Sequence, residues 1–158
     1  MSLAAEVLAS CRAKGWTLAT AESCTGGLIA GALTEVPGSS DVVDRGYVTY
    51  SNAAKVEMLG VRPETLEAHG AVSVEVAAQM AQGALERAGV SVAVSVTGIA
   101  GPGGSEFKPE GLVCFGLATA EGVETWRIEF GALGRSIVRA KSVETALQRI
   151  LAAAQPGP

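Results

Sequence analysis

The chain has 158 residues, of which 48% are hydrophobic and 4% aromatic, and it carries a net charge of −4 with no basic block. This length suits one domain with a core of aliphatic side chains, and the charge disfavours nucleic acid as the main partner. No segment approaches the roughly 20 consecutive apolar residues that a membrane span needs.

Helix-like and strand-like patterns alternate along the chain. In order, we expect a helix over 3–13, a strand over 16–21, a helix over 26–36, a strand over 44–51, helices over 52–59, 63–69 and 73–88, a strand over 90–96, a glycine-rich loop over 97–110, a hairpin over 112–119 and 123–130, and a helix over 136–153. The helical patterns place Leu28 and Ile137 among the buried side chains.

This order of elements predicts an α/β domain with three layers, α/β/α, because helices alternate with strands before a hairpin appears. The sheet is expected to be mixed and mainly parallel. We expect a single domain over 1–154, followed by a disordered tail over 155–158.

Residues 20–27 form a polar turn between a predicted strand and a predicted helix. Ser23 and Thr25 lie where backbone N–H groups lack helical partners. Such a turn attracts a substrate phosphate or the oxyanion of an acyl-transfer intermediate. An ordinary helix N-cap cluster uses the same residue types. The segment alone leaves both interpretations open.

Lys55 lies about one turn into the helix predicted for 52–59. The field at a helix N-terminus lowers the pKa of a lysine, and so does burial. A neutral lysine is a competent general base for a serine. A solvated surface lysine fits this segment equally well.

A glycine-rich loop over 97–104 leaves the most apolar strand. Ligands of open α/β sheets bind beyond the carboxyl ends of the strands, and glycines let backbone amides approach a ligand. The loop matches neither the dinucleotide-binding pattern nor the P-loop pattern, and a mobile surface loop is the alternative. Arg135 and Arg139 lie on one helix face and suit a phosphate, or else form solvated ion pairs.

His69 is the one histidine of the chain, so a Ser-His-Asp triad would have to use it. Its position at a helix end, before Gly70, favours a cation at the helix C-terminus instead. Cys24 is interpreted as a small packing residue rather than a nucleophile. The three cysteines are odd in number and widely spaced, which disfavours a disulfide framework or a zinc site and favours a reducing cytoplasm.

Several segments taken together resemble one known family. They are TAESCTGG (20–27), PGSS (37–40), GYVTYSNAAK (46–55), LGV (59–61), HGAVS (69–73), SVTGIAGPGG (95–104) and KPEG (108–111), in this order. The chain resembles the C-terminal domain of the competence/damage-inducible protein CinA over nearly its whole length.

The resemblance implies an amidohydrolase that converts nicotinamide mononucleotide to nicotinic acid mononucleotide and ammonia, in pyridine nucleotide recycling. It also implies a serine–lysine mechanism without metal or cofactor, and a homo-oligomer that is a dimer or larger. By motif, Ser23 is the expected nucleophile, Lys55 its base and Tyr50 an assisting hydroxyl. The expected substrate contacts are Thr25, Gly26, Gly27, Thr97, Gly98, Gly101, Arg135 and Arg139, with Lys108 as a further candidate for the phosphate.

Two alternative functions come from other classes. One is a non-catalytic module of the same family that binds a nucleotide or a protein. The other is a phosphoryl-transfer enzyme, which needs a divalent metal held by carboxylates near the glycine loop. Glu106 and Glu110 are the nearby carboxylates for that role.

Overall fold

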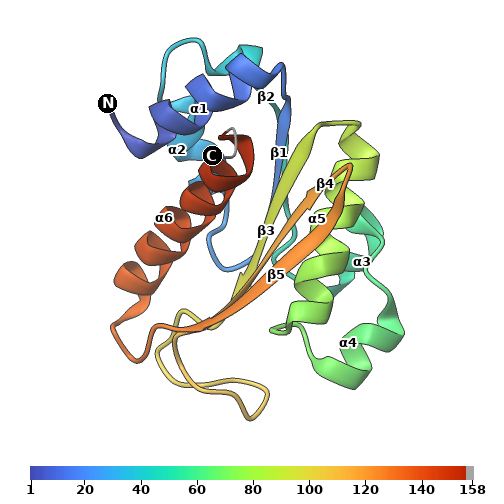
Figure 1. Ribbon diagram of the computed structural model, residues 1–158. Coiled ribbons are helices and arrows are strands. Elements are labelled where there is room, and N and C mark those ends of the chain that lie inside the picture. The colour runs from blue at the N-terminus through green and yellow to red at the C-terminus, as the bar shows by residue number, and fades with distance from the viewer. Residues whose placement is uncertain (156–158) are drawn as a thin grey trace.

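The computed structural model describes residues 1–155 and contains one five-stranded sheet between two helical layers (Figure 1). In chain order the elements are α1 (Leu3–Lys14), β1 (Leu18–Glu22), α2 (Leu28–Thr34), the 3₁₀ helix η1 (Ser39–Asp41), β2 (Val43–Val48), α3 (Asn52–Leu59), α4 (Pro63–His69), α5 (Val74–Ala88), β3 (Val92–Gly98), β4 (Leu112–Thr119), β5 (Gly122–Glu129) and α6 (Arg135–Ala154). The tail expected over 155–158 lies, apart from its first residue, outside the described residues.

The strand order is β2-β1-β3-β4-β5. β1 pairs in parallel with β2 and β3, whereas β4 pairs antiparallel with β3 and β5. The predicted three-layer α/β/α fold with a mixed sheet is therefore confirmed. None of the helices in residues 1–155 is long and apolar enough to cross a bilayer.

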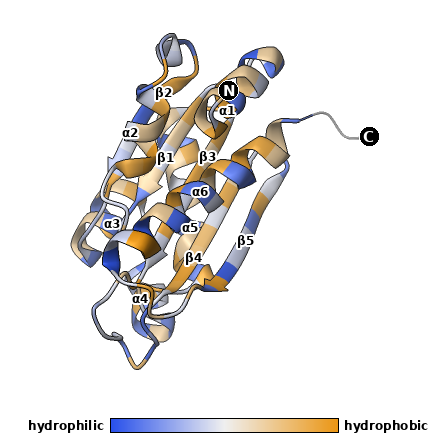
Figure 2. Ribbon diagram, turned by 90° about the vertical axis from the view of Figure 1, so that its left-hand side faces the viewer, coloured by the Kyte–Doolittle hydropathy of each residue, from blue (hydrophilic) through white to orange (hydrophobic). Residues whose placement is uncertain are grey.

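The core lies on both faces of the sheet, with α1, α2 and α6 on one side and α3, α4 and α5 on the other (Figure 1). β3 and β4 carry mostly hydrophobic residues along their length, whereas β5 mixes both kinds (Figure 2). This contrast follows from position, because central strands are covered on both faces and an edge strand is not.

Two side chains expected in the core are exposed. Leu28 is 43% exposed and Ile137 is 51% exposed. Each belongs to the first turn of its helix, α2 or α6, and the buried stripe of each helix begins only with the next residue, Ile29 or Val138. Helical periodicity gave the correct face but could not show where each helix first meets the sheet.

The carboxyl ends of β1 and β3 form a crevice. The connection that leaves β1 leads through α2 to β2, whereas the connection that leaves β3 leads to β4 on the other side. Loops that diverge in this way leave open space between two parallel strands, where ligands of α/β sheets bind. The fold therefore places residues 23–27 beside residues 97–104.

Gly83 in α5 sets the distance between α5 and α3, the helix that carries Lys55. A Cβ atom at this position would overlap the carbonyl oxygen of Leu59, a backbone atom that cannot rotate away. We expect Gly83→Ala to lower the free energy of unfolding by about 3 kcal/mol. For a domain of this size the melting temperature then falls by roughly 6–12 °C.

Gly31→Ala in α2 is the matched control, because a Cβ there meets nothing within 4 Å. Alanine in an open helical position is expected to stabilise by about 0.4–1 kcal/mol. Thermal unfolding followed by circular dichroism measures both variants. Equal melting temperatures for Gly83→Ala and wild type would contradict the assigned contact.

Candidate active site

A pocket of about 330 Å³ opens at the carboxyl ends of β1 and β3. Its charged or potentially catalytic lining residues are Ser23, Cys24, Tyr50, Lys55, Thr97, Glu106 and Arg135, and the backbone of 98–104 forms much of the remaining wall. Five segments that are distant in sequence thus meet here: the ends of β1 and β3, the start of α3, the linker between α4 and α5, and the start of α6.

Ser23 and Lys55 form a buried pair in this pocket. Ser23 follows β1 directly, and its amide donates to the carbonyl oxygen of Val96 in β3, which fixes the backbone of the turn. Lys55 Nζ lies 3.1 Å from Ser23 Oγ and 3.3 Å from the carbonyl oxygen of Tyr50. The exposed fractions are 7% for Ser23 and 1% for Lys55.

The position of Lys55 follows from the capping of α3. The hydroxyl of Ser51 accepts a hydrogen bond from the amide of Ala54, and Gly60 ends the helix in the left-handed conformation. These two caps fix a short helix whose buried side chains are Lys55 and Leu59, one turn apart.

Burial lowers the pKa of Lys55 below its ordinary value of 10.5, and nearby Cys24 and Glu106 offset part of this effect. No ion pair with Lys55 is found among residues 1–155. Desolvation without a paired carboxylate favours the neutral amine. A neutral amine within hydrogen-bond distance of a hydroxyl has the geometry of a base–nucleophile pair.

Glu22 holds the turn that follows Ser23, a role that the sequence did not suggest. One carboxylate oxygen accepts hydrogen bonds from the Thr25 hydroxyl (2.6 Å) and the Ile29 amide (2.9 Å), and the other accepts from the Ala30 amide (3.0 Å). The N-terminus of α2 favours a negative charge, and the fully buried carboxylate of Glu22 supplies it. The available signal was an acidic residue directly after the strand predicted for 16–21.

Thr25, Gly26, Gly27 and Arg139 shape this turn and do not line the pocket. The Gly26 amide donates to the carbonyl oxygen of Ser23, and both glycines have positive φ. Arg139 Nε donates to the carbonyl oxygen of Cys24 at 3.0 Å, and its Nη2 lies 3.4 Å from that of Thr25. These four expected substrate contacts are therefore absent from the pocket lining.

Arg135 lies at the mouth of the pocket. Its Nη1 donates to the carbonyl oxygen of Gly101 at 2.9 Å, and its Nη2 donates to the phenol oxygen of Tyr50 at 3.1 Å. The phenol of Tyr50 thus meets Arg135, and the Lys55 amine meets the carbonyl oxygen of Tyr50. The two arginines expected on one helix face have separate contacts, and of the two only Arg135 lines the pocket.

Thr97, Gly98 and Gly101 line the pocket as expected for the end of β3 and its loop. The Thr97 hydroxyl donates to the carbonyl oxygen of Ala71 at 2.9 Å, which ties β3 to the linker between α4 and α5. At Gly98 a Cβ atom would lie 2.8 Å from Cγ2 of Val113, so a side chain does not fit there. The loop is therefore closely packed at its base.

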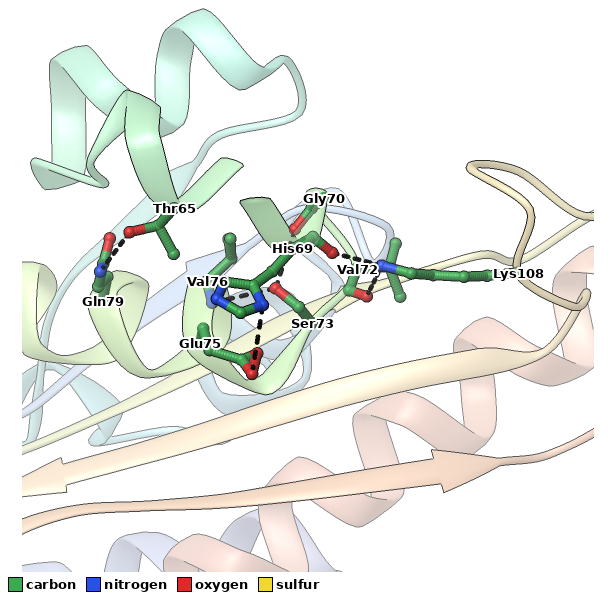
Figure 3. A network of polar contacts seen from close by, with 9 residues as sticks. All are labelled: Thr65, His69, Gly70, Val72, Ser73, Glu75, Val76, Gln79 and Lys108. Atoms are coloured by element: carbon green, nitrogen blue, oxygen red, sulfur yellow. Dashed lines mark hydrogen bonds and ion pairs between the residues drawn. The ribbon is translucent and has the colours of Figure 1, made fainter. Parts of the chain in front are cut away.

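The side chains of Lys108 and His69 lie near the linker between α4 and α5 and do not line the pocket (Figure 3). Lys108 Nζ donates to the carbonyl oxygens of His69 (2.6 Å) and Val72 (2.7 Å). The imidazole Nδ1 of His69 lies 3.6 Å from a carboxylate oxygen of Glu75. His69 therefore has a partner at the start of α5 rather than a place beside Ser23.

Cys24 lies beside the nucleophile candidate, but burial raises the pKa of its thiol to about 11. The thiol is therefore protonated at neutral pH and a poor nucleophile. Within residues 1–155 no group of three or more His, Cys, Asp or Glu side chains is placed to hold a metal ion. Glu106 and Glu110 each accept a backbone amide, that of Ala71 and that of Gly103.

Comparison with known proteins adds a family match. A model of the CinA C-terminal domain matches residues 1–154. A CinA-like protein of Chlorobium phaeobacteroides is 65% identical over 116 residues, which are 71% of this chain but 28% of that protein. A second CinA-like protein, of Chloroherpeton thalassium, is 61% identical, and the match covers 26% of it. The chain thus spans about a quarter of the length of these relatives.

Other relatives match over nearly their full length. The nicotinamide-nucleotide amidohydrolase PncC of Enterobacter agglomerans is 54% identical over 94% of this chain and 92% of that protein. PncC of Escherichia coli K12 is 50% identical over 95% and 92%. The crystal structure of the competence/damage inducible protein CihA from Agrobacterium tumefaciens superposes with a TM-score of 0.93 at 52% identity, covering 97% of this chain and 94% of that one.

Proposed function

The chain belongs to the CinA C-terminal domain family, and we propose that it is a nicotinamide-nucleotide amidase that hydrolyses the carboxamide of nicotinamide mononucleotide to the carboxylic acid and ammonia. The names and near-complete coverage of the PncC relatives support the substrate. The observation that carries the chemistry is the buried Lys55 amine, 3.1 Å from the Ser23 hydroxyl.

In the first step, neutral Lys55 takes the proton of Ser23 as Oγ attacks the carboxamide carbon. The carbonyl oxygen of the substrate becomes an oxyanion, which needs hydrogen-bond donors. Cys24 lines the pocket immediately after the nucleophile, and its amide is our candidate donor. The Gly26 amide of the same turn is engaged with the carbonyl oxygen of Ser23.

In the second step, the Lys55 ammonium gives its proton to the departing nitrogen, and ammonia leaves the acyl-serine. Water then attacks the ester carbon, and Lys55 takes a proton from that water and returns it to Ser23 Oγ. One amine thus serves as base and acid in turn. Its burial keeps the neutral form available for each new cycle.

Arg135 is our candidate for the substrate phosphate, because its guanidinium lies at the pocket mouth and, among residues 1–155, meets only the neutral oxygens of Gly101 and Tyr50. Arg139 and Lys108 are less suited, because neither of them lines the pocket. We further propose a homo-oligomer and a role in pyridine nucleotide recycling. The three free, buried cysteines are compatible with a cytoplasmic location.

The test is an ammonia-release assay on nicotinamide mononucleotide, with and without a metal chelator. We expect turnover that the chelator does not change, with nicotinic acid mononucleotide as the second product. Tight binding without ammonia would instead identify a non-catalytic nucleotide-binding module. Loss of turnover on chelation would favour a metal-dependent reaction and overturn the serine–lysine assignment.

A further inference from the structure

Among the described residues 1–155, three charged side chains line the pocket: Lys55, Arg135 and Glu106. The proposed function gives roles to the two cations and none to the carboxylate. A carboxylate is unfavourable beside a substrate phosphate, so its presence in this small pocket needs a reason.

Glu106 is held in place rather than free to swing away. One of its oxygens, Oε2, accepts a hydrogen bond from the Ala71 amide at 2.9 Å. The hydroxyl of Thr97 donates to the carbonyl oxygen of Ala71. Two residues further on, Lys108 reaches across to the carbonyl oxygens of His69 and Val72 (Figure 3). The loop that carries Glu106 is therefore fixed to the linker between α4 and α5.

The backbone at Glu106 also fixes its direction. The amides of Ser105 and Lys108 each donate to the carbonyl oxygen of the other, and the two residues between them, Glu106 and Phe107, have φ of 52° and 61°. Such two-residue turns ordinarily contain Asn or Gly, because other side chains are strained at positive φ. In this turn Phe107 is fully exposed to solvent and does not line the pocket, whereas Glu106, although also exposed, does line it.

The carboxylate acts on the interior of the pocket. Its charge raises the pKa of Lys55 and so opposes the effect of burial. Among residues 1–155, no hydrogen bond to its second oxygen, Oε1, is found. That oxygen is available to a ligand.

We propose that Glu106 makes the pocket selective for substrates whose aromatic ring carries a positive charge. This inference rests on the proposed function. A nicotinamide ring bonded through its nitrogen to ribose is a pyridinium cation, and it lies between the carboxamide at Ser23 and the phosphate at Arg135. A fixed carboxylate attracts this ring, whereas a neutral dihydropyridine ring of nearly the same shape gains nothing.

The experiment compares nicotinamide mononucleotide with its 1,4-dihydro form, which carries the same ribose and phosphate on a neutral ring. Dissociation constants are measured by calorimetry in a Ser23→Ala background, where no turnover occurs. We expect Glu106→Gln to reduce the preference for the charged ring roughly fivefold, the scale of a partly exposed charge pair. Glutamine keeps an oxygen for the Ala71 amide, so the variant removes the charge and not the anchor.

Glu110→Gln is the matched control. Glu110 lies in the same loop and likewise accepts a backbone amide, that of Gly103, but it does not line the pocket. We expect this variant to keep the wild-type preference. An equal loss in both variants would attribute the preference to net charge and overturn the inference, as would no loss in Glu106→Gln.

A second measurement does not depend on the folding of any Glu106 variant. Raising the salt concentration to about 0.5 M screens exposed charges, so we expect the preference for the charged ring to fall. Because both ligands carry the same phosphate, its contribution cancels from the ratio of their dissociation constants. If the preference is unchanged but wild type still releases ammonia from nicotinamide mononucleotide, the inference about Glu106 is wrong while the proposed function stands. If wild type neither binds that ligand nor releases ammonia, the proposed function fails as well.

Discussion

Ser23→Ala is expected to lower kcat for ammonia release by at least about 10⁴-fold, because an acyl-enzyme cannot form without the Oγ atom. The loss is expected to be confined to the chemical step. Ser23 is 7% exposed and follows β1, where its backbone amide, not its hydroxyl, fixes the turn to Val96. The variant should therefore fold normally and bind nicotinamide mononucleotide about as well as wild type.

Cys24→Ala is the matched control, since it removes a nucleophilic atom from the adjacent residue of the same turn. The Cys24 thiol, with its pKa of about 11, is not expected to contribute to attack. This variant should keep kcat within about one order of magnitude, the loss that a small packing defect beside the site can cause. If Cys24→Ala is inactive and Ser23→Ala is active, the nucleophile has been assigned to the wrong residue.

The fold could be predicted well from the sequence because its signals are local. The patterns over 52–59 and 63–69 gave helices with the observed bounds, and the nearly continuous apolar run before Thr97 gave the central strand. β1 and β3 each begin two residues later than predicted. Their ends also lie further along the chain, because Glu22 in β1 and Thr97 and Gly98 in β3 still pair in the sheet. Composition cannot show that a buried carboxylate belongs to a strand.

The site was predicted only in part. The motifs singled out Ser23 and Lys55, but their separation of 32 residues could be bridged only by the parallel pairing of β1, β2 and β3. The separate contacts of Arg135 and Arg139 could not be foreseen, because a spacing of four fixes a helix face but not the partner that each side chain reaches. Glu22 was missed as a component of the site, and Glu106 was considered only as a carboxylate that could hold a metal near the glycine loop.

Lys55→Met is expected to lower kcat by about 10³-fold, the typical contribution of a general base, while raising the stability of the fold. The amine is 1% exposed, and its pKa is lowered by burial, so at pH 7 the unfolded chain holds this proton more firmly than the folded chain. Burial of Lys55 therefore costs stability at neutral pH. Methionine fills a similar volume without that cost, and a gain of about 1 kcal/mol is expected.

The pH dependence gives the sign of this effect a separate test. Between the lowered folded pKa and the unfolded value near 10.5, the unfolded state binds more protons, so the cost of burying Lys55 shrinks as the pH rises. The stability difference between Lys55→Met and wild type, measured by denaturant unfolding, should therefore narrow toward pH 10.5. Wild-type kcat/KM should rise with pH through a kinetic pKa below 10.5.

Lys55→Arg separates a base from a buried positive charge. Arginine keeps the charge and cannot give up its proton in proteins, so we expect it to be as inactive as the methionine variant and no more stable than wild type. Substantial activity in Lys55→Arg would mean that position 55 supplies only charge to the Ser23 hydroxyl. In that case the proton of Ser23 must go to a group other than the buried amine, and the one-amine mechanism would be wrong.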